Sequence, residues 1–218
     1  MSKTRFLFEK TGTARYISHL DLMRTVKRAF TRAGFALRHS EGFNPHPLMV
    51  FALPLSVGQE SVCELLDVEF VGDLPENPLK SLNAALPDGL RVTEIYASER
   101  KFAKIRWLQI EGCLHYDNGV PDGAVARLTE VFGADSLVIH KKTKRGETNY
   151  DIKNDIIGIT FSDYNDKIIT VSATISAQNP TLNPSAITEV LAGVERLAPD
   201  FSEFRRTELY DEEMQVFR

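Results

Sequence analysis

The side chains best suited to chemistry in this sequence gather between Tyr16 and Pro47. Three histidines, His19, His39 and His46, fall in this segment, out of five in the chain. An imidazole ionises near neutral pH, so it can act as an acid, a base or a hydrogen-bond partner. His19 and His46 are therefore the candidate catalytic residues, and the chemistry they would perform together is acid-base catalysis.

Basic side chains form a row on the helix predicted after Ser18. Residues 1–50 hold nine Lys or Arg against three Asp or Glu, whereas the remaining residues hold seventeen against twenty-seven. Arg24, Arg28 and Arg32 are spaced four residues apart, so they share one face of the helix. Few acidic residues lie near these cations to pair with them. The row indicates contact with phosphates, and the alternative is a solvated helix face. The candidate nucleic-acid-binding residues here are Arg15, Arg24, Lys27, Arg28, Arg32 and Arg38, with Arg5 and Lys10 expected nearby.

The start of this helix has a simple structural explanation. Ser18 and Asp21 have the spacing of a helix cap, in which both side chains satisfy free amides of the first turn. His19 is not needed by the cap. The positive end of the helix dipole disfavours an imidazolium there, so His19 is free to serve catalysis, ligand contact or packing.

The loop from Ser40 to Pro47 is the second concentration of polar groups. Gly42 permits unusual backbone angles, while Pro45 and Pro47 restrict the exit from the loop. A stiff loop that carries polar groups is typical of a preorganised site. The candidate loop-site residues are Glu41, Phe43, Asn44 and His46.

Metal binding is not expected from this pattern. A site made of His19, His46 and Glu41 lacks the short ligand spacings typical of metal centres. Cys63 and Cys113 lie in predicted strands without a CxxC spacing, so we expect buried structural thiols. Two cysteines are too few for an iron-sulfur cluster bound by this chain alone, and we expect no bound cofactor.

A second basic cluster lies in the other half of the chain. Lys141, Lys142, Lys144 and Arg145 form a predicted hairpin turn in acidic surroundings. Such a turn is suited to gripping phosphates, and the alternative is a solvated loop tip. The sequence contains no GxGxxG, P-loop, GxSxG or HExxH motif, so no common enzyme class is indicated. No apolar run approaches the length of a membrane span, and we expect a cytoplasmic protein without a membrane partner.

Hydrophobic periodicity places these residues on an α+β fold. The first half predicts strands at 4–9, 48–57, 63–70 and 90–97 and helices at 18–33 and 78–86. The second half predicts strands at 104–116, 137–142, 150–161, 167–177 and 204–210 and helices at 123–132 and 183–197. The first order, β-α-β-β-α-β, is that of a split βαβ, ferredoxin-like module, and the second adds one strand.

A domain boundary is expected in the charged segment 98–103. This boundary gives an N-terminal module at 1–98 and a C-terminal module at 104–218. We expect two ferredoxin-like modules that pack together, each with an antiparallel sheet and helices on one face.

Three motifs in the first sixty residues resemble a known family. They are RFLFEKTG at 5–12, RYISHLDLMR at 15–24 and SEGFNPHP at 40–47, followed by ALPLSVG at 52–58. Together they resemble the radical-SAM-linked domain family of unknown function, whose members stand alone or follow a cobalamin-binding radical SAM protein. The resemblance continues through AALPDGL at 84–90 and the positions around Lys141 and Asp151.

The resemblance implies a partnership with a radical SAM protein and a link to RNA maturation. We therefore expect an accessory protein, more a binding module than an enzyme, that presents tRNA or rRNA to its partner. RNA is expected, not DNA. Two alternatives stay open: a metal-independent ribonuclease that uses His19 and His46 as acid and base, and a loop at 40–47 that only docks a protein.

Overall fold

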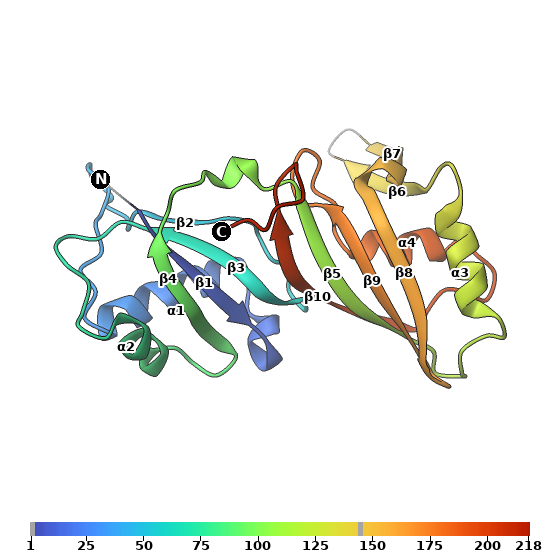
Figure 1. The fold of residues 1–218 in the computed structure, drawn as a ribbon, viewed down its shortest axis with the longest axis horizontal. Coiled ribbons are helices and arrows are strands. Elements are labelled where there is room, and N and C mark those ends of the chain that lie inside the picture. Colours follow the sequence, from blue (N-terminus) through green and yellow to red (C-terminus); the bar gives the residue numbers. More distant parts are fainter. Residues whose placement is uncertain (1–2, 144–145) are drawn as a thin grey trace. The chain divides into compact units, whose positions relative to one another are not determined.

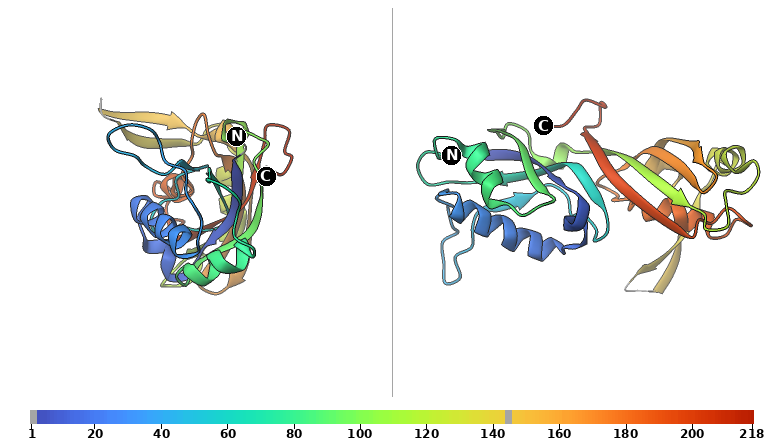
Figure 2. Two further views of the ribbon diagram at one scale, coloured as in Figure 1. Left: turned by 90° about the vertical axis from the view of Figure 1, so that its left-hand side faces the viewer. Right: turned by 90° about the horizontal axis from the view of Figure 1, so that it is seen from below.

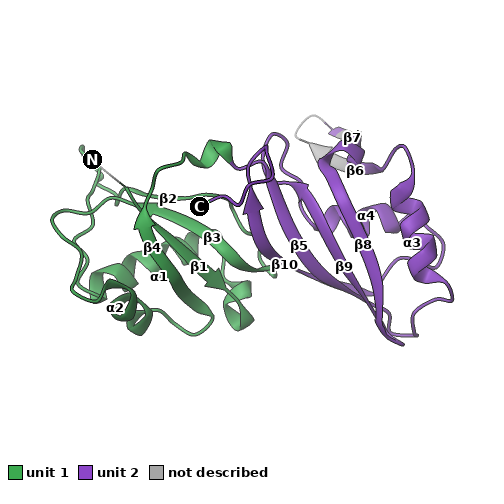
Figure 3. Ribbon diagram, in the orientation of Figure 1, with its two compact units in different colours: residues 1–104, 218 green, residues 105–217 purple. Residues whose placement is uncertain are grey.

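The computed structural model describes residues 3–143 and 146–218 (Figure 1). The chain divides into two compact units, residues 1–104 with Arg218 and residues 105–217 (Figure 3). Helices and antiparallel strands occur in both units, so the predicted α+β class is confirmed. No helix in the described ranges has the length and apolar character that crossing a membrane requires.

Unit 1 follows the predicted order of strands and helices. Its sheet runs β4-β1-β3-β2, and each neighbouring pair is antiparallel. The elements are β1 (Thr4–Lys10), α1 (His19–Arg32), β2 (Met49–Phe51), β3 (Glu60–Val68), α2 (Pro78–Ala85) and β4 (Leu90–Ala97), with short 3-10 helices at Gly12–Tyr16 and Phe102–Lys104.

The helices of unit 1 share one core with its sheet. Alternate residues of β1 face this core, because side chains of a strand point to opposite sides in turn. Phe6 lies at the centre, with ring centroids 5.0 Å from Phe30 and 5.9 Å from Phe70. Leu82 of α2 joins the same buried cluster. The apolar stripe of α1 is thereby buried, and its polar face is left outside.

Unit 2 has the same strand order with one insertion. Its sheet runs β10-β5-β9-β8, and the hairpin β6–β7 forms a separate sheet that projects from it (Figure 2). The elements are β5 (Trp107–His115), α3 (Ala124–Gly133), β6 (Val138–Thr143), β7 (Gly146–Asp151), β8 (Ile156–Asn165), β9 (Ile168–Ser176), α4 (Ser185–Leu191) and β10 (Phe201–Tyr210), with a 3-10 helix at Lys153–Asp155.

The two faces of this sheet differ in character. On β9, Ile169, Val171, Ala173 and Ile175 are buried, and the threonines and serine between them face the other way. Residues directly opposite one another in an antiparallel pair share a face. The polar face therefore continues across β5 and β10.

Three predicted elements differ from the structure. The strand expected at 48–57 covers only β2, since Leu53 and Leu55 are buried on either side of Pro54 in an irregular segment. The strand expected at 150–161 is two strands, because the Asp151 carboxylate accepts the Lys153 amide at 2.9 Å and turns the chain. The helix expected at 183–197 ends at Leu191.

Candidate nucleic-acid interface

Helix α1 begins with the predicted cap. The Asp21 amide donates to Ser18 Oγ at 3.1 Å, and the Ser18 hydroxyl donates to the Asp21 carboxylate at 2.8 Å. Arg24 Nη1 lies 3.3 Å from the same carboxylate. The Ser18 hydrogen bond, with a smaller effect of Arg24, holds the pKa of Asp21 below its usual value. The first turn is therefore rigid and locally neutral.

The two candidate catalytic histidines have different neighbours. The ring of His19 packs edge-on against Phe51, with centroids 5.3 Å apart. His46 Nδ1 lies 2.9 Å from Ser40 Oγ in the following loop. Acid and base must both reach the same phosphate in a ribonuclease. Within the described ranges neither imidazole contacts the other, so the geometry adds no support to that hypothesis.

The loop after α1 is closed at its base by short contacts. The Ser40 amide donates to the His46 carbonyl at 2.8 Å, and the His46 amide donates to Ser40 Oγ at 3.1 Å. His39 and Pro47 form an isolated antiparallel bridge just below. His46 is thus a structural brace of the loop as well as a polar group on it.

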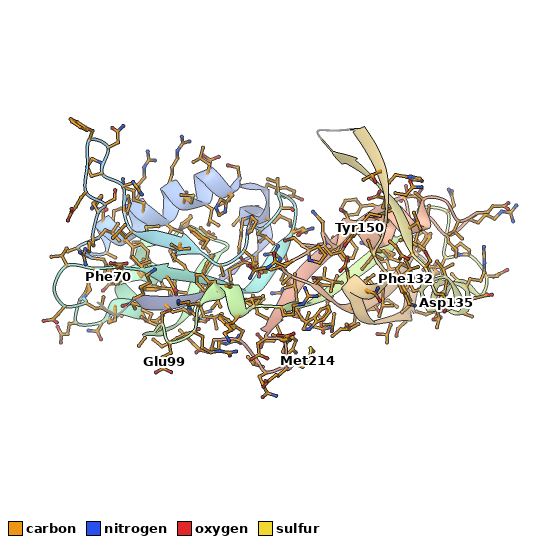
Figure 4. The ribbon with its side chains drawn as sticks, turned by 90° about the horizontal axis from the view of Figure 1, so that it is seen from above. Phe70, Glu99, Phe132, Asp135, Tyr150 and Met214 are labelled. Carbon is orange, nitrogen blue, oxygen red and sulfur yellow. The ribbon has the colours of Figure 1, made fainter. Side chains whose placement is uncertain are left out.

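The tip of this loop is open to solvent. Residues 41–46 are all exposed, and Phe43 has a relative exposure of 106%. Gly42 adopts φ +120°, a backbone angle that favours glycine and lets the chain turn next to Phe43. The loop extends from unit 1 on the side where α1 lies (Figures 2 and 4). The loop that carries the uncovered Phe43 ring thus extends on the same side of unit 1 as the basic helix α1.

Most of the predicted phosphate-binding arginines have partners inside unit 1. Arg15 Nη2 lies 3.4 Å from Glu60, and Arg38 Nη1 lies 3.6 Å from Glu69. Arg32 Nη2 donates to the carbonyl of Ala85, the last residue of α2, at 2.6 Å. Each of these three contacts joins two segments of unit 1, whereas the contact between Arg24 and Asp21 lies within α1.

Lys27 and Arg28 are the exceptions. Both side chains are exposed on α1, and neither has a partner among residues 3–143 and 146–218. Side chains of α1 extend into solvent on the side of the 40–46 loop (Figure 4). We call the exposed face of α1 with Arg24, Lys27 and Arg28, together with the loop at 40–46, the α1–loop surface.

The expectation that Arg5 and Lys10 add to a cationic surface is wrong. Arg5 is fully buried and forms an ion pair with Asp67, and Lys10 Nζ donates to the Arg15 carbonyl at 3.0 Å. The Arg5 partner, Asp67, lies on β3, so the sequence around Arg5 contained no sign of this ion pair, whereas the Lys10 partner lies only five residues further along the chain.

The second basic cluster is described only in part. Lys141 and Lys142 lie on β6, with backbones opposite Thr148 and Glu147 of β7. Lys144 and Arg145 lie outside the described residues. The turn prediction therefore stays a prediction.

The structure also groups residues that the sequence analysis kept apart. Among the described residues, side chains with metal-ligating atoms within 4.8 Å of one another occur at Cys113, His115 and Glu203, and not at His19, Glu41 and His46. Cys63 is buried as expected, but Cys113 is half-buried on the polar face of β5, which corrects its assignment to the core. The Cys-x-His spacing on one strand was the signal for this pair, since alternate residues share a face.

Solved structures resemble this fold at low identity. A chain of "Crystal Structure of a Cbf5-Nop10-Gar1 Complex" has a TM-score of 0.53 and 13% identity, over 96% of this chain and 50% of that one. A chain of "Structure of H/ACA RNP bound to a substrate RNA containing 2'-deoxyuridine" has a TM-score of 0.47 and 10% identity, over 98% and 48%. The protein thus spans about half the length of these chains, and the first likeness is one of fold alone.

Comparison with curated proteins finds no match. A family model does match, over residues 3–184. This range includes the α1–loop surface and the β6–β7 hairpin, and it ends directly before α4. Because the match covers most of the chain, the protein belongs to the family described as "Uncharacterized protein conserved in bacteria (DUF2344)".

Proposed function

We propose that this protein binds RNA through the α1–loop surface and presents it to a radical SAM enzyme. One observation carries the proposal: Lys27 and Arg28 are exposed on α1 without a partner among the described residues, and α1 lies on the side of unit 1 from which the loop with the exposed Phe43 extends. Exposed cations without an internal partner attract phosphates, and an uncovered aromatic ring attracts an unstacked base.

RNA fits this surface better than duplex DNA. Proteins read RNA mostly at loops and single strands, where bases are splayed out and stack on aromatic side chains. The braced loop restricts Phe43 before binding, which lowers the entropy lost when a base stacks on it.

The scaffold is consistent with two ferredoxin-like modules at 1–98 and 104–218. The order β4-β1-β3-β2 with helices after β1 and β3 supports this arrangement for the first module. The order β10-β5-β9-β8 supports it for the second, with β6–β7 as an insertion.

The partner and the RNA class rest on the family resemblance of the first sixty residues. It favours a radical SAM protein as partner and tRNA or rRNA as the bound molecule. Two cysteines are fewer than an iron-sulfur cluster needs, so the radical chemistry belongs to the partner. The chain itself acts as an accessory protein and binds no cofactor for that chemistry.

Salt-dependent RNA binding tests the proposal. The affinity of the full chain for total tRNA and for rRNA fragments is measured over a range of salt concentrations. Each lost phosphate contact flattens the slope of log K against log salt by about 0.7 for single strands. Lys27→Ala with Arg28→Ala should therefore flatten the slope by about 1.4, that is, twice 0.7.

A charge-matched control distinguishes RNA binding at this surface from general electrostatic attraction between RNA and any cation of the protein. Arg91 and Lys101 are exposed cations of unit 1 on other segments, so Arg91→Ala with Lys101→Ala removes the same charge. The control should leave the slope unchanged. RNA binding that is absent at low salt, or equally weakened by both pairs, rejects the α1–loop surface as the RNA site.

Partner capture tests the second half of the proposal. The tagged chain should co-purify with a radical SAM protein from cells, as identified by mass spectrometry. If Asn44→Ala with His46→Ala abolishes this capture while RNA binding stays unchanged, the loop docks the protein and the RNA site reduces to α1. Failure to capture any radical SAM protein rejects the partnership but leaves the RNA result standing.

A further inference from the structure

Three side chains with different ligating atoms meet on the polar face of unit 2. Cys113 and His115 lie two residues apart on β5, so they point to the same side of the sheet. Glu203 of β10 stands directly opposite Cys113 in the strand register. Their Sγ, imidazole nitrogen and carboxylate oxygen atoms all lie within 4.8 Å of one another.

Among the described residues, none forms a hydrogen bond with the Nε2 atom of His115. Its Nε2 lies 3.5 Å from Glu203 Oε1. This nitrogen is buried, and it has no hydrogen-bond partner in the part of the chain that the structure describes. The ring packs against Phe201, its cross-strand neighbour, with centroids 5.5 Å apart. A buried ring nitrogen without a hydrogen bond is costly unless another ligand satisfies it.

The donor set matches the preferences of zinc. Zn²⁺ binds cysteine sulfur, histidine nitrogen and carboxylate oxygen at about 2.0 to 2.3 Å. Tetrahedral ligands at those distances lie about 3.3 to 3.8 Å from one another. The His115–Glu203 separation of 3.5 Å already falls in that range. The Cys113 Sγ atom lies within 4.8 Å of both other ligand atoms, and a rotation of its side chain would shorten that distance.

The electrostatics of the group favour a cation. Burial, and next the charge of Glu203, raise the pKa of the Cys113 thiol above its usual value. A divalent ion reverses this effect, since it displaces the thiol proton and pairs with both the thiolate and the carboxylate.

We propose that Cys113, His115 and Glu203 bind a divalent transition-metal ion, with zinc as the ion that best fits their sulfur, nitrogen and oxygen donors. Three protein ligands leave one position of a tetrahedral site for water or an exogenous ligand. The site lies on the sheet of unit 2 and does not depend on RNA binding by unit 1.

Cobalt and zinc titration tests the site. The full chain is stripped with a chelator and titrated with Co²⁺, whose thiolate complexes absorb through sulfur-to-cobalt charge transfer. One equivalent should produce this absorption, and Zn²⁺ should abolish it by displacement. Cys113→Ser should remove the absorption, while His115→Gln and Glu203→Gln should each weaken binding by at least about tenfold, the cost seen even for outer-shell partners.

Cys63 provides the matched control. It is the other cysteine of the chain and is buried in unit 1, so Cys63→Ala should leave the absorption intact. Circular dichroism checks the fold of each variant. If Cys113→Ser does not fold, the His115→Gln and Glu203→Gln variants, at half-exposed positions, test the site instead. Zn²⁺ should raise the Tm of the wild type and should not raise the Tm of these variants. Binding below one equivalent, or an absorption that survives in folded Cys113→Ser, overturns the proposal.

Discussion

Arg5 and Asp67 form a two-pronged ion pair between β1 and β3. Arg5 Nε donates to Asp67 Oδ1 at 2.7 Å, and Arg5 Nη2 donates to Asp67 Oδ2 at 2.9 Å. The two residues are direct cross-strand neighbours, and Arg5 Nη2 also donates to Ser98 Oγ and the Arg100 carbonyl. The Phe102 ring lies 4.4 Å from the guanidinium carbon. A cation that composition assigned to the surface thus organises the interior of unit 1.

Removing one partner of this pair should strongly destabilise unit 1. The Arg5 and Asp67 side chains are 0% and 8% exposed, so Arg5→Ala or Asp67→Ala leaves a buried charge unpaired. The cost of a broken buried pair is about 3 to 5 kcal/mol of unfolding free energy. Urea denaturation measures it, with the exposed Arg91→Ala as control at a change within about 0.5 kcal/mol. A loss equal to that of the control would contradict the structural role of the pair.

Ser18→Ala should destabilise α1 and raise the pKa of Asp21. Loss of the N-cap costs about 1 kcal/mol. The Asp21 pKa is lowered in the folded protein, so its stabilising effect is present at neutral pH and is lost as the pH falls below the usual carboxyl range. An NMR pH titration of the wild type and Ser18→Ala checks the shift. The same Asp21 pKa in both proteins would contradict the hydrogen bond.

Phe43→Ala should weaken RNA binding without changing stability. The ring is exposed and buries no surface in the fold, so the free energy of unfolding should stay within about 0.5 kcal/mol. Loss of one stacked base costs about 1 to 3 kcal/mol of binding. Fluorescence anisotropy with labelled RNA measures the affinity. Phe43→Trp is the control and should preserve binding, while unchanged affinity in Phe43→Ala excludes stacking at this position.

Arg32→Ala should affect stability and not the salt dependence of RNA binding. Its guanidinium donates a hydrogen bond to the Ala85 carbonyl. Loss of such a hydrogen bond lowers the free energy of unfolding by about 1 kcal/mol. Thermal unfolding detects that loss. The slope of affinity against salt should match the wild type, in contrast to Lys27→Ala with Arg28→Ala. A flattened slope for Arg32→Ala would return this residue to the set of phosphate contacts.

Tyr96 should ionise far above the usual range for tyrosine. Burial, opposed by the positive charge of Arg5, raises the pKa of Tyr96 to about 12. A raised pKa means that the native state holds the proton more tightly than the unfolded chain, so stability is lost as the pH rises from about 10 toward 12. Ultraviolet difference titration follows the phenolate. Tyr96→Phe should remove the phenolate absorption that appears at the highest pH. If this absorption persists in the variant, another tyrosine is its source.

Local structure was largely predictable from the sequence. The period of apolar residues in α1, the Ser18 cap and the end near Gly34 depend on neighbours within a few residues, and they appear as predicted. The segment 48–57 was mispredicted because its apolar residues are buried in an irregular chain, which short-range strand propensity does not distinguish from a strand.

The candidate sites were predictable only where they are local. The polar loop at 40–47 was predicted from its Gly and Pro residues, and the structure adds that residues 41–46 are exposed. The sequence could not show which cations are already neutralised. Glu60 begins β3, Glu69 follows it, and Ala85 ends α2. They therefore meet Arg15, Arg38 and Arg32, respectively, only after the sheet and helices assemble.

The sequence by itself determined the α+β class, most helices and strands, the basic α1 and the preorganised loop, since all of these follow from spacing along the chain. Tertiary structure alone decided which of the predicted phosphate-binding residues on α1 have no partner within residues 3–143 and 146–218, namely Lys27 and Arg28, and that Glu203 meets Cys113. The physical reason is strand register, which is set by the burial of alternate apolar residues along whole strands and decides which distant residues face each other. A short window of sequence does not contain this total burial, so it cannot reveal the register.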